Sequence, residues 1–118
     1  MKLTLTALAL AIALPSFAAD VQVIKIGLSG PLSGANAFAG KDNENGVRLA
    51  VDELNAKQPK VAGKAVRFEL LSEDDQGDPK AGVNVAQKFA DAGVHFVLGP
   101  YNSGVALPAA RVYNDAGI

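Results

Sequence analysis

Apolar residues along the chain follow two alternating spacings, one typical of strands and one typical of helices. Residues 21–28 are β-branched or apolar at most positions, which predicts a short buried strand. A loop rich in Gly, Ser and Pro follows, and then apolar side chains return at the i, i+3, i+4 and i+7 positions of a helix face. These positions are Val47, Ala50, Val51 and Leu54. The helix is expected to begin near Gly40 and to end at Gln58–Pro59.

The same alternation repeats in the next segment. From Ala65 apolar and charged residues alternate, which predicts a second strand that ends as the chain reaches residues 72–75. Asp78 followed by Pro79 predicts the start of a second helix, with Asp as the N-cap and Pro at the first helical position. Gly93 is expected to end it as the left-handed C′ residue. Its predicted buried face consists of Gly82, Val85, Ala86 and Phe89.

A third repeat completes the chain. Residues 96–98 predict a short buried strand, and a helix is expected to begin at Ser103 and to end at Gly117. Pro108 is expected within the first turn of this helix, where its missing N–H costs least. The predicted apolar helix positions are Val105, Leu107, Val112 and Tyr113.

Three strand–helix units with long connections predict an α/β fold with parallel strands, right-handed crossovers and a doubly wound, Rossmann-like sheet. A fourth strand would be expected directly after Ile118. A three-stranded parallel sheet leaves an apolar edge unpaired. We therefore expect the sequence to be an amino-terminal fragment that folds poorly when isolated.

Composition removes several classes of function. The chain has no cysteine, which excludes disulfides, thiolate metal sites and cysteine nucleophiles. With a single histidine, His95, we expect neither a histidine-based metal site nor a cofactor. The formal net charge of −1 offers no basic excess for nucleic acid.

The first residues are typical of a secretory signal. Lys2 precedes an apolar run over residues 3–14, and Ser16 and Ala18 occupy the small-residue positions of a cleavage site. The run is shorter than the 18 or so apolar residues that a membrane-spanning helix requires. We expect residues 1–18 to be a signal peptide, cleaved after Ala18 or Ala19, and residues 19–118 to form the exported domain. Without a cysteine for a lipid anchor, the exported product is expected to be soluble.

Enzymatic and nucleotide-binding sites are not indicated. The glycines near the first strand do not have the G-x-G-x-x-G spacing of a dinucleotide fold. Ser103 is not in a Gly-x-Ser-x-Gly turn, and His95, the available base, is expected at the opposite end of its strand. The acidic cluster at residues 73–75 does not have calcium-loop spacing and is expected to be a solvated loop. Asp74 or Asp75 could still reach the rim of a crevice, because both follow the end of a strand.

Ligand capture is the remaining interpretation. In open α/β sheets, ligands lie outside the carboxyl ends of the strands, where three loops are expected to meet. Hydroxyl and amide groups near the third helix start are suited to a carboxylate, and two aromatic side chains could flank an apolar ligand group. The candidate ligand-binding residues are Phe38, Ala39, Tyr101, Asn102, Ser103 and Gly104.

Each main candidate also has a structural alternative. Phe38 could be a hydrophobic staple at the entrance to its helix. Ser103 could be a plain N-cap, and Tyr101 could point to solvent or toward a second lobe.

Five segments in this order resemble the periplasmic branched-chain amino-acid-binding proteins of ABC importers, of the leucine/isoleucine/valine type. They are residues 24–27, 30–34, 40–46, 73–80 and 99–103. The resemblance implies part of the first lobe of a two-lobed, type I periplasmic binding fold that closes on its ligand by hinge motion. It also implies a function: capture of a branched-chain or other aliphatic amino acid and its delivery, by a monomer, to an ABC permease in the inner membrane.

The resemblance assigns roles to individual residues. The ligand carboxylate would be held at Ser103, and the side-chain pocket would be lined by Phe38 and Ala39, where many family members have a tyrosine. Some relatives join the second and third loops by a disulfide, and Gly77 and Asn102 occupy those places here. Alternative ligands are a short amide, urea or an aromatic acid, and an alternative class is the ligand-sensing domain of a receptor.

Overall fold

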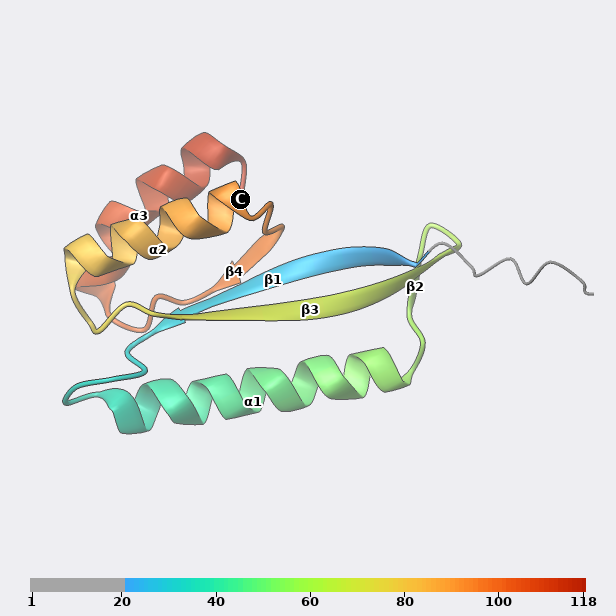
Figure 1. The fold of residues 1–118 in the computed structure, drawn as a ribbon, viewed down its shortest axis with the longest axis horizontal. Coiled ribbons are helices and arrows are strands. Elements are labelled where there is room, and N and C mark those ends of the chain that lie inside the picture. The colour runs from blue at the N-terminus through green and yellow to red at the C-terminus, as the bar shows by residue number, and fades with distance from the viewer. Residues whose placement is uncertain (1–20) are drawn as a thin grey trace, which may run out of the picture.

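The computed structural model describes residues 21–118, which form a central sheet with helices on both faces (Figure 1). The elements in chain order are β1 (Gln22–Gly30), α1 (Ala37–Ala56), β2 (Lys60–Val61), β3 (Lys64–Asp74), α2 (Pro79–Asp91), β4 (Phe96–Leu98) and α3 (Ser103–Ala116). Helix α1 lies on one face of the sheet, and α2 and α3 lie together on the other (Figure 1). The predicted doubly wound α/β class is confirmed. The predicted signal peptide, residues 1–18, lies outside the described residues.

The strand order in the sheet is β2-β3-β1-β4, which makes β1 a central strand. Strand β1 pairs in parallel with β3 on one side and with β4 on the other, as the sequence predicted. The sequence did not predict β2, which pairs antiparallel with β3 through a two-residue turn. Both turn residues, Ala62 and Gly63, have positive φ angles of 49° and 79°. This is the backbone of a tight hairpin, without the Asn-Gly pair that usually signals one.

Helix α1 supplies hydrogen bonds to the outer side of β3. The side-chain amide of Asn55 donates to the Phe68 carbonyl at 2.9 Å and accepts from the Phe68 N–H at 2.8 Å. Nearby, the Val66 N–H donates to the Pro59 carbonyl at 3.0 Å. The outward-facing Val66 N–H and both outward-facing backbone groups of Phe68 are therefore satisfied although β2 is only two residues long.

The second helix matches its sequence prediction closely. The Asp78 carboxylate accepts from the backbone N–H groups of Lys80 and Ala81 at 2.9 and 2.8 Å, and Pro79 follows it as the first helical residue. Gly93 has the left-handed φ of 67° expected of a C′ residue. All four residues of the predicted buried face are buried.

Two predictions of helix position were wrong. Helix α1 begins at Ala37, not near Gly40. Helix α3 begins at Ser103, as predicted, and its N-cap is Asn102, so the alternative that Ser103 is a plain N-cap was wrong. Pro108 is the sixth helical residue and lies in the second turn, not in the first, so the Gly104 carbonyl does not receive its usual helical N–H. Gly104 is exposed, so water can satisfy that carbonyl. The predicted end at Gly117 is confirmed, with a left-handed φ of 73°.

The buried core lies on the face of the sheet that α2 and α3 cover. Val85, Phe89 and Val94 form its centre. The Phe89 ring packs so closely on Gly27 of β1 that an added Cβ there would lie 2.8 Å from the ring. Leu107, predicted as an apolar helix position, is instead exposed on α3. Of the apolar face predicted for the first helix, Val51 is buried but Ala50 and Leu54 are exposed, because α1 covers only β1 and β3.

Candidate functional site

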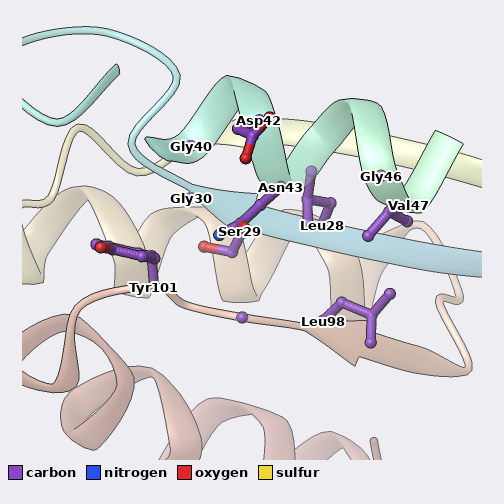
Figure 2. A pocket seen from close by; sticks show the side chains of 11 residues that line it. Leu28, Ser29, Gly30, Gly40, Asp42, Asn43, Gly46, Val47, Leu98 and Tyr101 are labelled. Carbon is purple, nitrogen blue, oxygen red and sulfur yellow. The ribbon is translucent and has the colours of Figure 1, made fainter. Parts of the chain in front are cut away.

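A cavity of about 470 Å³ opens between α1 and the carboxyl ends of β1 and β4. Figure 2 shows its side chains coming from β1, α1, β4 and the loop between β4 and α3. Leu28 and Leu98 lie together with Val47 of α1 at one end, whereas Ser29 and Tyr101 lie toward the other. This position agrees with the crevice that the sequence predicted outside the strand ends.

Of the six predicted ligand-binding residues, Tyr101 lines this cavity. Its side chain is about half exposed, so it is free to meet a ligand or a second lobe. Phe38 and Ala39 lie in the first turn of α1, adjacent to Gly40, which does line the cavity. Phe38 is 77% exposed and is inside the helix, so the hydrophobic-staple alternative, which needs a packed residue before the N-cap, was wrong.

The start of α3 offers unused hydrogen-bond donors at the same edge. Ser103 and Gly104 are its first two residues, so their backbone N–H groups have no acceptor within the helix. The Ser103 hydroxyl is on the exposed first turn. Such a helix start favours an anion through its free N–H groups and its dipole. Two free N–H groups and a hydroxyl therefore lie together at this helix start, although Ser103 is not the cap.

Asn102 differs from an ordinary N-cap. Its side chain makes no capping hydrogen bond, and its Oδ1 is buried without a partner among the described residues. It lies beside Gly77 in the loop after β3. The second and third loops therefore contact each other where the resemblance places a disulfide in some relatives.

The sequence predicted that the acidic residues 73–75, at the end of β3, form a solvated loop. This prediction was wrong for Asp75. Asp75 is fully buried, where the Ser29 hydroxyl donates to it at 2.8 Å and the Gly77 N–H donates at 2.9 Å. The Tyr113 hydroxyl is buried nearby without a well-aligned hydrogen bond. Burial raises the pKa of Tyr113; the neighbouring Ser29 hydroxyl lowers it and the negative charge of Asp75 adds to the rise.

The neighbouring Asp74 faces the loop between β1 and α1. Its carboxylate accepts hydrogen bonds from the Leu32 N–H at 2.8 Å, from the Ser33 N–H at 3.3 Å and from the Ser33 hydroxyl. The Gln76 N–H also donates to it at 2.8 Å. Partial burial would raise the pKa of Asp74, but these hydrogen bonds together outweigh it and hold the pKa below its ordinary value of 3.8.

Three polar residues of the cavity were missed by the sequence reasoning. Asp42 and Asn43 reach it from α1, and Ser29 reaches it from the end of β1 (Figure 2). Asn43 is four residues before Val47, so it belongs to the helix face that turns toward the sheet. From that spacing Asn43 could have been predicted as a cavity residue. It was missed because a helix start near Gly40 placed Asp42 and Asn43 in the first turn, where helices fray.

Within residues 21–118 no cluster of three His, Cys, Asp or Glu side chains is arranged to hold a metal ion. Over the same residues, no helix combines the length and apolar character needed to cross a membrane.

The sequence profile of the family described as "Periplasmic binding protein" matches residues 23–118. The chain belongs to this family, whose members are binding proteins of the type I fold, as the resemblance predicted. Among its relatives is the Leu/Ile/Val-binding protein BraC3 of Rhizobium johnstonii, which is 44% identical over 95 residues. That match includes 80% of this chain but 25% of the relative, so the chain spans about a quarter of the length of the curated relatives it matches.

Solved structures give the same fold with different ligands. The branched-chain amino acid transporter substrate binding protein LivJ from Streptococcus pneumoniae, in complex with isoleucine, has a TM-score of 0.73 and 31% identity. The match covers 82% of this chain and 27% of LivJ. A solute binding protein of an ABC transporter from Rhodopseudomonas palustris BisB5, in complex with 3,4-dihydroxybenzoic acid, has a TM-score of 0.67 and 28% identity, and covers 81% of this chain and 25% of that protein.

Proposed function

We propose that this chain is the amino-terminal part of the first lobe of a periplasmic solute-binding protein of an ABC importer. The protein captures a branched-chain or other aliphatic amino acid and delivers it to the inner-membrane permease. A signal peptide over residues 1–18 directs it to the periplasm, where residues 19–118 contribute to a monomeric, two-lobed receptor. No covalent chemistry on the ligand is part of this function.

The observation that carries the proposal is the position of the α3 start. Its first two N–H groups and the Ser103 hydroxyl directly follow the loop that leaves β4, the strand whose end borders the cavity. An amino acid presents a carboxylate, which these donors can hold by charge-assisted hydrogen bonds. Asn102 and Gly104 shape the backbone around Ser103.

Two exposed aromatic side chains near the cavity support the choice of an apolar ligand side chain. Phe38 is largely exposed at the start of α1, and Tyr101 is half exposed at the cavity. Covering exposed aromatic groups near a cleft with an apolar ligand group lowers the free energy, because apolar surface is removed from water. Phe38, Tyr101 and Ala39 form the proposed side-chain pocket. In this proposal the other lobe binds the ligand ammonium group.

A second ligand class, an aromatic acid, is favoured by one observation. A structural relative binds 3,4-dihydroxybenzoic acid, and such a ligand also presents a carboxylate to the α3 start. The aromatic pair Phe38 and Tyr101 would suit its ring as well as an aliphatic chain.

Calorimetric titration of the complete protein tests these alternatives. L-leucine, L-isoleucine, L-valine, L-alanine and 3,4-dihydroxybenzoate are titrated separately into the purified protein. The proposed function predicts tight binding of at least one aliphatic amino acid. Binding of the benzoate alone would replace the amino acid by the aromatic acid. Conversion of any of these compounds would overturn the proposal of a binding protein.

A further inference from the structure

Two adjacent carboxylates at the end of β3 face different surroundings. Asp75 is enclosed in the sheet edge with Ser29, whereas Asp74 is partly exposed and turned to the loop between β1 and α1. Neither lines the cavity. The Asp74 hydrogen bonds therefore act on the loop between β1 and α1 and not directly on a ligand in the cavity.

The loop over residues 31–36 has few other attachments. Leu32 N–H also donates to the Gly30 carbonyl at 3.0 Å, and Pro31 packs against Gly40, where an added Cβ would overlap the Pro31 carbonyl. Ser33 is exposed, and its hydrogen bonds in the described part of the chain go to Asp74. Within residues 21–118, the Asp74 carboxylate is thus the side chain that hydrogen-bonds this loop to a strand.

This loop leads directly into the first turn of α1. The Asn36 carbonyl accepts from the Ala39 and Gly40 N–H groups at 3.1 Å each, so the loop end and the helix start form one hydrogen-bonded unit. A shift of the loop therefore shifts Phe38 and Ala39, the proposed wall of the side-chain pocket. Gly40, in contact with Pro31, transmits the same displacement to the cavity lining.

We infer that Asp74 is a positioning residue that sets the selectivity for the ligand side chain by fixing residues 31–36 and the first turn of α1. This inference rests on the proposed function. The carboxylate accepts four hydrogen bonds at once, and an alanine side chain at this position accepts none. Recognition of the ligand carboxylate at α3 is independent of Asp74, because the α3 start is on a different loop.

The test measures selectivity and not affinity alone. Dissociation constants for L-leucine, L-valine and L-alanine are determined by calorimetry for the complete wild-type protein and for Asp74→Ala. A pocket wall that senses a methylene group discriminates by about tenfold or more. Loosening this wall is therefore expected to lower the leucine-to-alanine ratio of affinities by about fivefold. Hydrogen exchange at the Leu32 and Ser33 amides is expected to become faster in the same variant.

Two further variants separate positioning from general damage. Glu73→Gln removes the neighbouring carboxylate, whose partner is Lys88 on α2 at 2.9 Å, and is expected to leave the ratio unchanged. Asp74→Asn keeps one acceptor oxygen for the Leu32 and Gln76 N–H groups and is expected to restore most of the wild-type ratio. If Asp74→Ala does not fold, Ser33→Ala supplies the test, because it removes one of the Asp74 hydrogen bonds from an exposed position.

The outcomes distinguish the two proposals. A wild-type protein that binds none of the three amino acids overturns the proposed function and, with it, the selectivity role. A wild-type protein that binds them, with the same leucine-to-alanine ratio in Asp74→Ala or Ser33→Ala, overturns the positioning role alone. An equal change of ratio in Glu73→Gln would also overturn it, because the effect would then not be specific to the loop.

Discussion

The two faces of the sheet differ in how completely they are covered. On one face, α2 and α3 enclose Phe89, Val85, Val105 and Ala109, each at most 4% exposed. On the other face, α1 is 20 residues long but buries only Gly40 and Val51. We call the face covered by α2 and α3 the finished face, because its core is closed by packed side chains. The α1 face contains the cavity.

The difference shows which part of the molecule provides stability and which provides a ligand surface. Contacts between the elements of the finished face are close: α2 packs on Gly27 through Phe89 and on Val105 through Gly82. On the α1 face, Leu98 and Tyr101 remain about half exposed beside the cavity. We expect substitutions to divide in the same way, with stability lost on one face and ligand binding changed at the cavity edge.

The largest effect is expected in the core of the finished face. Phe89→Ala should lower the free energy of unfolding by about 3–5 kcal/mol, because it removes a buried ring and leaves a cavity. Urea unfolding of the complete protein measures it. Val51→Ala on the α1 face is the comparison, with an expected loss of roughly 1 kcal/mol. Equal losses at both sites would contradict the difference between the faces.

Removal of the Ser103 hydroxyl should affect binding and leave stability nearly unchanged. Ser103→Ala is expected to weaken amino-acid binding by about 1–3 kcal/mol, because a hydrogen bond to the ligand carboxylate is lost. Calorimetry provides the measurement, and Leu107→Ala, at an exposed position on the same helix, is the control. Unchanged affinity would remove Ser103 from the site.

The Asp74 loop contact gives a pH dependence of predictable sign. Because hydrogen bonds hold the folded-state pKa of Asp74 below its ordinary value of 3.8, the stabilisation is complete above that value and is lost as the pH falls through the folded-state pKa. Urea midpoints measured between about pH 6 and about pH 3 should therefore fall more steeply in wild type than in Asp74→Asn. Parallel pH profiles would show that the contact does not stabilise the fold.

The smallest effect on overall binding is expected at Phe38. Because the side chain is exposed and at the start of α1, Phe38→Ala should change the preference among aliphatic ligands more than the affinity for their common carboxylate. Parallel titrations with L-leucine, L-valine and L-alanine test this. A uniform loss for all three would contradict a role in the side-chain pocket.

Much of the architecture follows from local sequence. The alternation in β3, the Asp78–Pro79 helix start and the i, i+3, i+4 face of α2 are signals within a few residues, and each appears in the structure as predicted. Where local signals competed, the prediction failed. Asn102 and Ser103 are both good N-caps, and the structure uses Asn102; from either cap Pro108 lies beyond the first turn.

The candidate site could be predicted only in part. Its location followed from the topology, since the carboxyl ends of parallel strands meet at one edge. The burial of Asp75 could not be predicted, because its partner Ser29 is 46 residues away in sequence. The cavity role of Ser29 likewise depends on α1, which lies over the strand ends and closes the other side of the cavity.

The amide contact between Asn55 and Phe68 has a consequence for aggregation. Unpaired strand edges are templates on which other chains add as new strands. Here a helix side chain occupies the edge of β3 directly after the two-residue β2 ends. Intermolecular strand addition at Phe68 therefore first requires the Asn55 side chain, in the last turn of α1, to leave the strand edge.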